Sequence, residues 1–320
     1  MAITLSILLI VLGFGLLIKG ADWMVTGASA LAKKKNISDL AIGLTVVAFG
    51  TSAPELVVNA IASSEGYADI TFGNVLGSNN FNLFAILGVV GLILPLKVQA
   101  STAWKEIPIS FFALCVVFLL ANEVVFQPSN IVSQVEGLFL LLLFGAFLAY
   151  VFFQMKATPV ATEIAVESPA NLKIGSLILF GLAGLILGGK LVVDNAVDIA
   201  AGLGVSEKII GLTIIAAGTS LPELVTSVVA ALRKNSDMAI GNIIGSNIFN
   251  LLLVLSVSSM IAPLDYNPTF NTDMYLLGGG TIFLFLAMFT GKKKTLDRWE
   301  AGVLLVVFVT YTASLIGQEL

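Results

Sequence analysis

A 34-residue segment occurs twice in this chain, and the second copy follows the first by 168 positions without a gap. The copy at 50–83 reads GTSAPELVVNAIASSEGYADITFGNVLGSNNFNL, and the copy at 218–251 reads GTSLPELVTSVVAALRKNSDMAIGNIIGSNIFNL. The two copies are identical at 17 of the 34 positions, which include Gly, Thr, Ser, Pro, Glu, Asn and Phe. Any of several aliphatic residues can maintain an apolar helix face, so matched polar residues indicate a role that needs their atoms. We therefore expect the function to lie in this repeat.

The remainder of the chain is strongly apolar. Of its 320 residues, 58% are hydrophobic and 11% are charged, and the mean hydropathy is +1.01. Soluble domains carry about 25% charged residues, so this composition predicts an all-α integral membrane protein. A bilayer core of about 30 Å requires roughly 20 apolar residues in a helix. This length predicts ten transmembrane spans, at about 3–32, 39–63, 69–96, 105–123, 131–154, 173–202, 207–232, 237–263, 273–290 and 298–316.

Several functional classes are excluded by what the sequence lacks. It contains no His, which removes haem ligation, histidine proton relays and most transition-metal sites. A nucleophile–His pair is therefore impossible, and no GxxxxGK[ST] loop occurs, so we predict neither an enzyme nor a primary pump. The net charge of −4 and the lack of a basic tail argue against nucleic acid as a partner. We expect no cofactor and no obligate protein partner.

The longest polar connection divides the chain into two five-span halves. The first half covers 1–155, the connection covers 156–172, and the second half covers 173–320. Of the 16 Lys and Arg residues, 13 lie in alternate loops and hence on one side of the membrane. The positive-inside rule makes that side cytoplasmic, so the connection is predicted to be a cytoplasmic linker and both termini to face outward. These residues are Lys33, Lys34, Lys35, Lys97, Lys105, Lys156, Lys173, Arg233, Lys234, Lys292, Lys293, Lys294 and Arg298.

The two copies of the repeat are predicted to cross the membrane in opposite directions. Five spans separate the copies, and an odd number of spans reverses the direction of the chain. Inverted repeats are typical of secondary transporters, whose binding sites form near the midplane where the two halves meet. A duplication retained only for packing would have allowed the polar positions to diverge.

A proline interrupts the helix in each copy. Pro54 and Pro222 have no N–H group, and each ring clashes with the carbonyl four residues earlier, at Gly50 and Gly218. The helix must kink or open at these points, which frees carbonyl oxygens. Free backbone oxygens at membrane depth are tolerated only where they line a cavity or meet a ligand. The prolines therefore predict a ligand site near the middle of each span.

Oxygen-bearing side chains surround both breaks. Glu55 and Glu223 follow the prolines directly, and a carboxylate inside a membrane is a functional candidate by default. Two carboxylates among six to eight oxygens suit Ca²⁺, and subsets of the same oxygens suit Na⁺. Four other repeat residues, Asn74, Asn79, Asn242 and Asn247, fit a structural role as well as an ion-facing one. The neutral candidate ligands are Thr51, Ser52, Ser78 and Asn82 in the first copy, and Thr219, Ser220, Ser246 and Asn250 in the second.

The doublet GTSxPEL…GNxxGSNxFN, present twice and inverted, resembles the α-repeats of the cation/calcium exchanger superfamily. Within it, the whole chain is similar to the prokaryotic sodium/calcium exchangers in span number, orientation and central loop. The resemblance implies ten helices and four cation sites at the midplane, with Glu55 and Glu223 as the central ligands. It also implies that the carbonyl oxygens of Ala48 and Ala216 face the ions. The long first and sixth spans would form a separate pair that slides across the remaining helices.

The implied activity is exchange of cytoplasmic Ca²⁺ for external Na⁺ across the cell membrane by alternating access. Some members of the superfamily carry Asp where this chain has Asn250, so the site here has two carboxylates rather than three. Bound Ca²⁺ would then be neutralised, whereas three Na⁺ would leave one positive charge. A proton-coupled exchanger of the same fold stays open, because two adjacent carboxylates can share a proton. A passive cation channel is a further alternative.

Charged residues also occur in spans outside the repeat. Lys190 and Asp194 are four residues apart in the sixth span. This spacing places them on one helix face, and pairing is how buried charges are usually retained. We expect the two side chains to form an ion pair.

Overall fold

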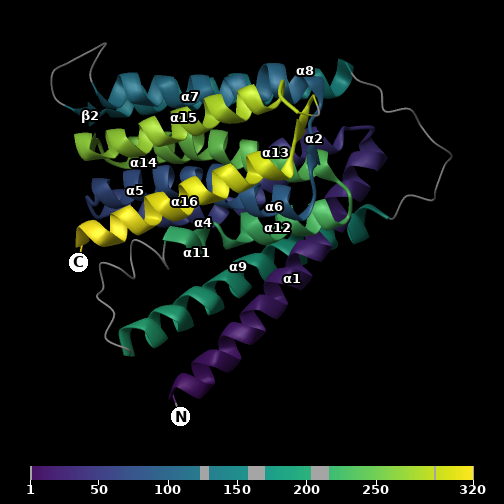
Figure 1. Cartoon of the computed structure of the whole chain (residues 1–320), viewed down its shortest axis with the longest axis horizontal. Helices are drawn as coiled ribbons and strands as arrows, with labels where there is room; N and C mark the ends of the chain where they lie inside the picture. The colour runs from purple at the N-terminus through teal and green to yellow at the C-terminus, as the bar shows by residue number, and fades with distance from the viewer. Residues whose placement is uncertain (1, 123–129, 158–169, 203–215, 292, 320) are drawn as a thin grey trace.

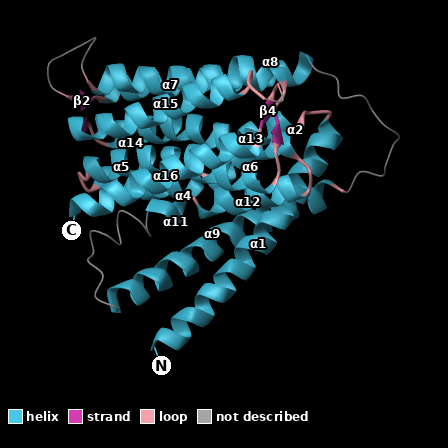
Figure 2. Ribbon diagram, viewed as in Figure 1, coloured by secondary structure: helices cyan, strands magenta, loops and turns pink. Residues whose placement is uncertain are grey.

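The described part of the molecule is almost entirely helical, with four short strands (Figure 2). This confirms the predicted helical class. Residues 158–169 of the predicted linker, residues 207–215 of the predicted seventh span, and Lys292 lie outside the described residues. The computed structural model describes residues 2–122, 130–157, 170–202, 216–291 and 293–319.

The first half begins with one very long helix and continues with interrupted ones. Three short π-helical segments, η1, η2 and η3, lie within these longer helices. Such π turns occur frequently at functional sites, and η2 includes Asn82. The elements are α1 (Ala2–Lys35), α2 (Asp39–Ile42), η1 (Gly43–Val47), α3 (Ala48–Thr51), α4 (Ala53–Ser64), α5 (Ala68–Asn80), η2 (Phe81–Ile86), α6 (Leu87–Ile93), β1 (Leu96–Lys97), η3 (Thr102–Glu106), α7 (Ile107–Ala121), β2 (Ile131–Val132) and α8 (Gln134–Ala157).

The second half repeats this order of elements. Helices α11, α12, α13 and α14 coincide residue for residue with α3, α4, α5 and α6 when the sequence is shifted by 168 positions. The local structure therefore follows the repeated sequence. The described elements are α9 (Asn171–Gly202), α11 (Ala216–Thr219), α12 (Leu221–Leu232), α13 (Ser236–Ile248), η5 (Phe249–Val254), α14 (Leu255–Ile261), β3 (Leu264–Asp265), η6 (Pro268–Phe270), α15 (Asn271–Ala287), β4 (Thr295–Leu296) and α16 (Arg298–Glu319).

Two small antiparallel sheets join the halves. β1 pairs with β4 and places Leu96 opposite Leu296, while β2 pairs with β3 and places Ile131 opposite Asp265. Each sheet takes one strand from each half, and exchange of the halves converts one sheet into the other. Contacts of this reciprocal kind are expected from an approximate twofold axis.

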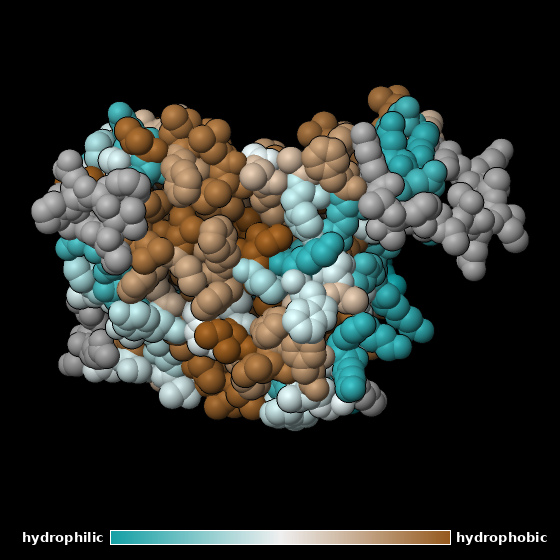
Figure 3. All heavy atoms as spheres, turned by 90° about the horizontal axis from the view of Figure 1, so that it is seen from above, coloured by the Kyte–Doolittle hydropathy of each residue, from teal (hydrophilic) through white to brown (hydrophobic). Residues whose placement is uncertain are grey.

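The helices differ strongly in how far they are enclosed. In the described part of the chain, seven helices are long and apolar enough to cross a membrane, and the bent pair Asp39–Thr51 and Ala53–Ser64 gives an eighth. In the span formed by α13, η5 and α14, 94% of an apolar stretch of 18 residues is buried inside the molecule. The corresponding share in α16 is 17%. Hydrophobic side chains also cover much of the face in Figure 3. The chain is therefore an integral membrane protein with the repeat at its centre.

Helices α1 and α9 pack backbone against backbone and lie diagonally to the other helices (Figure 1). Glycines allow this close approach. A Cβ atom at Gly20 would lie 2.7 Å from the amide nitrogen of Leu185, and one at Gly188 would lie 2.7 Å from the carbonyl oxygen of Gly13. No side chain fits at such distances, so the pair depends on small residues, as membrane helix pairs often do.

We expect Gly20→Ala to destabilise the protein by about 1–3 kcal/mol, because the added methyl group meets backbone that must move. Thermal unfolding of the purified protein in detergent measures this as a lower unfolding temperature. Gly15→Ala on the same helix is the matched control, since a Cβ atom there meets nothing within 4 Å. Equal unfolding temperatures for the two variants would contradict the close packing of α1 on α9.

Candidate cation site

Each copy of the repeat begins at a break between two helical segments. The helix that ends with α3 and the helix α4 are bent by 47° relative to one another. Ser52, at the break, has φ −84° and ψ 5°, and the equivalent Ser220 has φ −91° and ψ 7°. Pro54 and Pro222 each lie in the first turn of the helix that follows. The interruptions predicted from these prolines are confirmed.

The breaks bring each carboxylate to a hydroxyl group of the opposite half. Glu55 and Glu223 are both fully buried. The Ser52 hydroxyl donates to Glu223 Oε1 at 2.9 Å, and the Ser220 hydroxyl donates to Glu55 Oε1 at 3.3 Å. Two carboxylates buried in one site repel one another whenever both are charged. Each half therefore supplies part of the surroundings of the other half's carboxylate.

The threonine before each break also bonds to the opposite half. The Thr51 hydroxyl donates to Asn242 Oδ1 at 3.0 Å, and the Thr219 hydroxyl donates to Asn74 Oδ1 at 3.3 Å. Asn242 Nδ2 donates to the Ser227 hydroxyl at 3.0 Å. Both amide atoms of Asn242 thus bind protein groups, and this side chain ties the first break to α13.

Four asparagines form a reciprocal clamp between the halves. Asn82 Nδ2 donates to Asn247 Oδ1 and Asn250 Nδ2 donates to Asn79 Oδ1, both at 3.1 Å. Asn79 Nδ2 donates to the Asn247 carbonyl at 3.3 Å, and Asn247 Nδ2 donates to the Asn79 carbonyl at 3.4 Å. Asn79 and Asn247 therefore have a structural role. Their side-chain oxygens accept hydrogen bonds from Nδ2 of Asn82 and Nδ2 of Asn250. The Oδ1 atoms of Asn82 and Asn250 are left without a hydrogen-bond partner.

Several buried oxygens in this region have no hydrogen-bond partner, and four of them are equivalent atoms of the two copies. These four are Glu55 Oε2, Glu223 Oε2, Asn82 Oδ1 and Asn250 Oδ1, two pairs that exchange of the halves interconverts. An unpaired buried acceptor costs free energy, which a bound cation can offset. Carboxylate and amide oxygens are ligands of hard cations, so the set could hold Ca²⁺ or Na⁺. Within the described residues, no group of three or more His, Cys, Asp and Glu side chains offers an alternative metal site.

The two serines of the later part of the repeat differ between the halves. Ser246 donates to Glu223 Oε1 at 3.4 Å, whereas the equivalent Ser78 donates to Asn74 Oδ1 at 3.2 Å. Both serines are fully buried. The hydrogen bonds therefore do not fully follow the symmetry of the sequence. Glu223 accepts a hydrogen bond from one more hydroxyl group than Glu55 does.

The alanine carbonyls suggested by the family resemblance lie just before the breaks. The Ala48 carbonyl accepts the N–H of Ser52 at 2.9 Å, and its oxygen lies 3.3 Å from the Thr51 hydroxyl, whose one proton has a shorter contact with Asn242 Oδ1. Ala216 is the first residue of α11, and its side chain lies outside the described part of the structure.

Asn59 is a polar residue near the site that the sequence comparison missed. It is fully buried one turn after Glu55, and its Nδ2 donates to the Glu55 carbonyl at 2.8 Å. Its Oδ1 has no partner. The equivalent residue is Ser227, so the two copies are not identical here and their comparison could not select it. The sequence feature that points to Asn59 is its position, four residues after the candidate carboxylate Glu55.

No cation of the protein neutralises the two carboxylates within the described residues. The side-chain groups that donate to Glu55 and Glu223 are hydroxyls, which carry no charge. The ion pair predicted between Lys190 and Asp194 does not form among the described residues, so that prediction is wrong. Both side chains are exposed on α9. The described residues therefore supply no positive charge to the two carboxylates.

Comparison with known proteins identifies the family. The model described as "Sodium/calcium exchanger protein" matches residues 5–153 and 174–317. The chain belongs to the sodium/calcium exchanger family. Among its relatives, CaxA of Alkalimonas amylolytica is 39% identical over 312 residues, covering 94% of this chain and 96% of that protein. Sodium/calcium exchanger MaX1 of Methanosarcina acetivorans is 32% identical over 348 residues, covering 97% and 98% respectively.

A solved structure has the same fold as this exchanger. The structure of the sodium-calcium exchanger NCX_Mj, soaked with Na⁺ and Sr²⁺, superimposes with a TM-score of 0.83 and 33% sequence identity. The match covers 98% of this chain and 99% of that one. The resemblance noted in the sequence is therefore confirmed at the level of family and fold.

Glu55→Gln and Glu223→Gln should each lower the affinity for Ca²⁺ by roughly 100-fold or more, because each removes one of two buried charges that face the ion. Calorimetric titration of the purified protein with Ca²⁺ measures this. Glu106→Gln is the matched control, because Glu106 is equally buried but hydrogen bonded to Tyr150 outside the site. A Glu55→Gln variant that binds Ca²⁺ like the unmodified chain would contradict the assignment.

Asn79→Ala should reduce Ca²⁺ affinity by about tenfold, because Asn250 loses the acceptor that orients its amide. The same titration detects the change. Asn80→Ala tests whether any buried asparagine of α5 matters equally, since Asn80 is 1% exposed and donates to the Asp273 carbonyl instead. The clamp is not needed for binding if both variants keep their affinity.

Proposed function

We propose that this chain is a secondary antiporter that exchanges Ca²⁺ for Na⁺ across the cell membrane by alternating access. Membership of the sodium/calcium exchanger family supports the identity of the two ions. The transported ions are the only ligands of the site, and no cofactor takes part. The chain is a transporter and not an enzyme.

The observation that carries this proposal is the set of four unpaired oxygens between the halves. Two belong to carboxylates and two to amides, which matches the hard-oxygen ligands of Ca²⁺ and Na⁺. Neighbouring hydroxyl and carbonyl oxygens complete the shell when an ion enters. The proposed ligands are Glu55, Glu223, Thr51, Thr219, Ser52, Ser220, Ser78, Ser246, Asn82 and Asn250, with the carbonyl oxygens of Ala48 and Ala216.

The charge of the site explains why transport would be coupled exchange. An empty site leaves the carboxyl groups of Glu55 and Glu223 buried with no basic partner, and an uncompensated buried charge is strongly unfavourable. Bound Ca²⁺ neutralises both carboxylates, and Na⁺ ions can do so instead. The protein therefore opens the site to the other side of the membrane only while ions are bound to it. Ca²⁺ leaves the site as Na⁺ replaces it.

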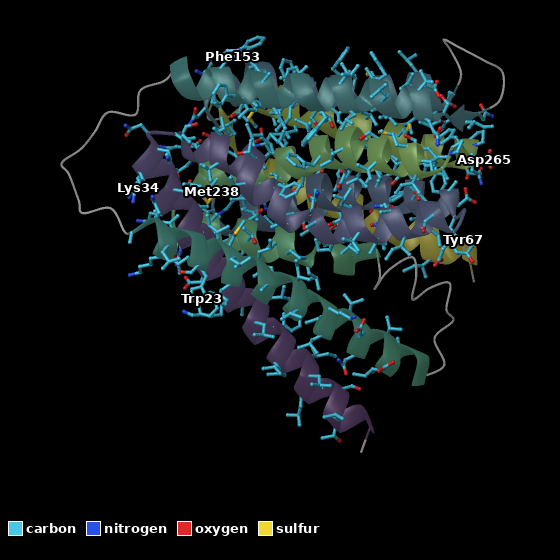
Figure 4. The ribbon with its side chains drawn as sticks, turned by 180° about the vertical axis from the view of Figure 1, so that it is seen from behind. Trp23, Lys34, Tyr67, Phe153, Met238 and Asp265 are labelled. Carbon is cyan, nitrogen blue, oxygen red and sulfur yellow. The ribbon has the colours of Figure 1, made fainter. Side chains whose placement is uncertain are left out.

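We further propose that the architecture comprises ten spans in two inverted halves, 1–155 and 173–320. Figure 4 supports the inversion: Tyr67, which precedes α5, lies at the opposite end of the molecule from Met238, in the first turn of the equivalent α13. Helices α5 and α13 therefore run in opposite directions. Such a pair of halves can exchange conformations and open to either side in turn.

The orientation in the membrane follows from the basic residues. Lys34 and Met238 lie at one end of the molecule and Asp265 at the other (Figure 4). Lys34 belongs to the basic set at the predicted cytoplasmic ends of the spans, so we place this end in the cytoplasm together with the linker 156–172. Both termini then face outward. The α1–α9 pair is the unit that slides against the other helices.

In sealed vesicles containing the purified protein, an outward-directed Na⁺ gradient should drive uptake of radioactive Ca²⁺. The coupling is expected because Na⁺ and Ca²⁺ occupy the same oxygens. A pH gradient at constant Na⁺ should drive no uptake. Uptake driven by the pH gradient alone would replace this assignment with a proton-coupled exchanger.

The variant Glu223→Gln should abolish this uptake, whereas Glu106→Gln should retain it. A flux that continues with no counter-ion, at rates too fast for a conformational cycle, would indicate a passive channel.

A further inference from the structure

A hollow of about 520 Å³ lies between α1 and α12, outside the proposed ion site. Its aliphatic walls come from both helices and include Ile18, Val229 and Leu232. Ile18 and Leu232 are 58% and 64% exposed, so they face the bilayer. Gly15 leaves one side of the hollow open, because a Cβ atom there meets nothing within 4 Å. The hollow is therefore a groove that opens toward lipid.

Three charged residues line the same groove. Lys19 Nζ lies 3.3 Å from Asp22 Oδ2. Arg233 contacts the other carboxylate oxygen of Asp22 and donates to Thr26 Oγ1 at 2.6 Å. The Asp22 carboxylate therefore pairs with two positively charged side chains, and the three residues together have a net charge of +1.

This charge lies on a helix that crosses the membrane. Lys19 belongs to the apolar span Thr4–Lys35, where an unpaired charge is costly unless it reaches the headgroups. Its Nζ lies 5.5 Å from the centre of the Trp23 ring, and Trp is enriched at headgroup level. Trp23 lies toward the same end of the molecule as Lys34 (Figure 4). The charged part of the groove is therefore near the level of the lipid phosphates.

We propose that this groove binds one anionic phospholipid of the surrounding bilayer. The lipid phosphate accepts hydrogen bonds from Lys19 and Arg233 and neutralises the remaining charge. An acyl chain lies along Ile18, Val229 and Leu232. Basic pockets between membrane helices are typical sites for such headgroups. Because the groove has one wall on α1 and the other on α12, the bound lipid holds these two helices together.

The test is native mass spectrometry of the full-length protein titrated with phosphatidylglycerol in detergent. Lys19→Gln should weaken phosphatidylglycerol binding about fivefold, as expected for loss of one basic contact. Lys35→Gln is the matched control, because Lys35 is an exposed lysine of the same helix outside the groove. Equal weakening in both variants, or none in Lys19→Gln, overturns the site.

Asp22→Asn gives a prediction of opposite sign. Removing the carboxylate releases both cations for the phosphate, so phosphatidylglycerol binding should strengthen, and a weaker affinity contradicts the proposal. Phosphatidylcholine should bind less tightly than phosphatidylglycerol, because its headgroup is neutral overall. Inorganic phosphate that displaces the lipid at equal concentration would instead identify a site for a soluble anion. Lipid binding is measured without transport, so this test is independent of the exchange activity.

Discussion

The mutual repulsion of Glu55 and Glu223 is the constraint on which the rest of this molecule depends. Two carboxylates are fully buried between the halves, and no basic side chain of the described part of the chain pairs with them. A buried charge without a partner is among the most unfavourable features that a folded protein can contain. Its presence here is reasonable if cations from outside the protein supply the missing charge. The free amide oxygens of Asn82 and Asn250 beside them have the same explanation.

The approximate twofold relation between the halves makes this arrangement possible. Ser52 and Ser220 each bond to the carboxylate of the other half, and Asn79 and Asn247 each hold an amide of the other half. Neither half therefore contains a complete site. In the proposed cycle, the α1–α9 pair takes one helix from each half and slides across the helices that carry these ligands, which changes the side from which the site is reached. The differences between the halves, such as the contact of Ser246 with Glu223, are superimposed on this symmetry.

Comparison of the two copies predicted the centre of the site but not its connections. The broken helices follow from Pro54 and Pro222 by local sterics, and the carboxylates stand out because charge is rare in an apolar span. The choice of partner depends on contacts between residues more than 160 positions apart, which spacing along one helix cannot reveal. For this reason the clamp through Asn79 and Asn247 stayed ambiguous in the sequence. The ion pair between Asp22 and Arg233 also joins residues far apart in the sequence, so spacing could not predict it. The pair that spacing did predict, within α9, does not form.

In the proposed exchange, Ca²⁺ and Na⁺ occupy the same buried oxygens in turn. The most direct measurement is equilibrium binding of radioactive Ca²⁺ to the purified protein at fixed pH while Na⁺ is raised, with choline as the control cation. We expect Na⁺ to displace Ca²⁺ completely and competitively, and choline to displace none. Bound Ca²⁺ that persists at saturating Na⁺ would show that the two ions have separate sites and would contradict the account.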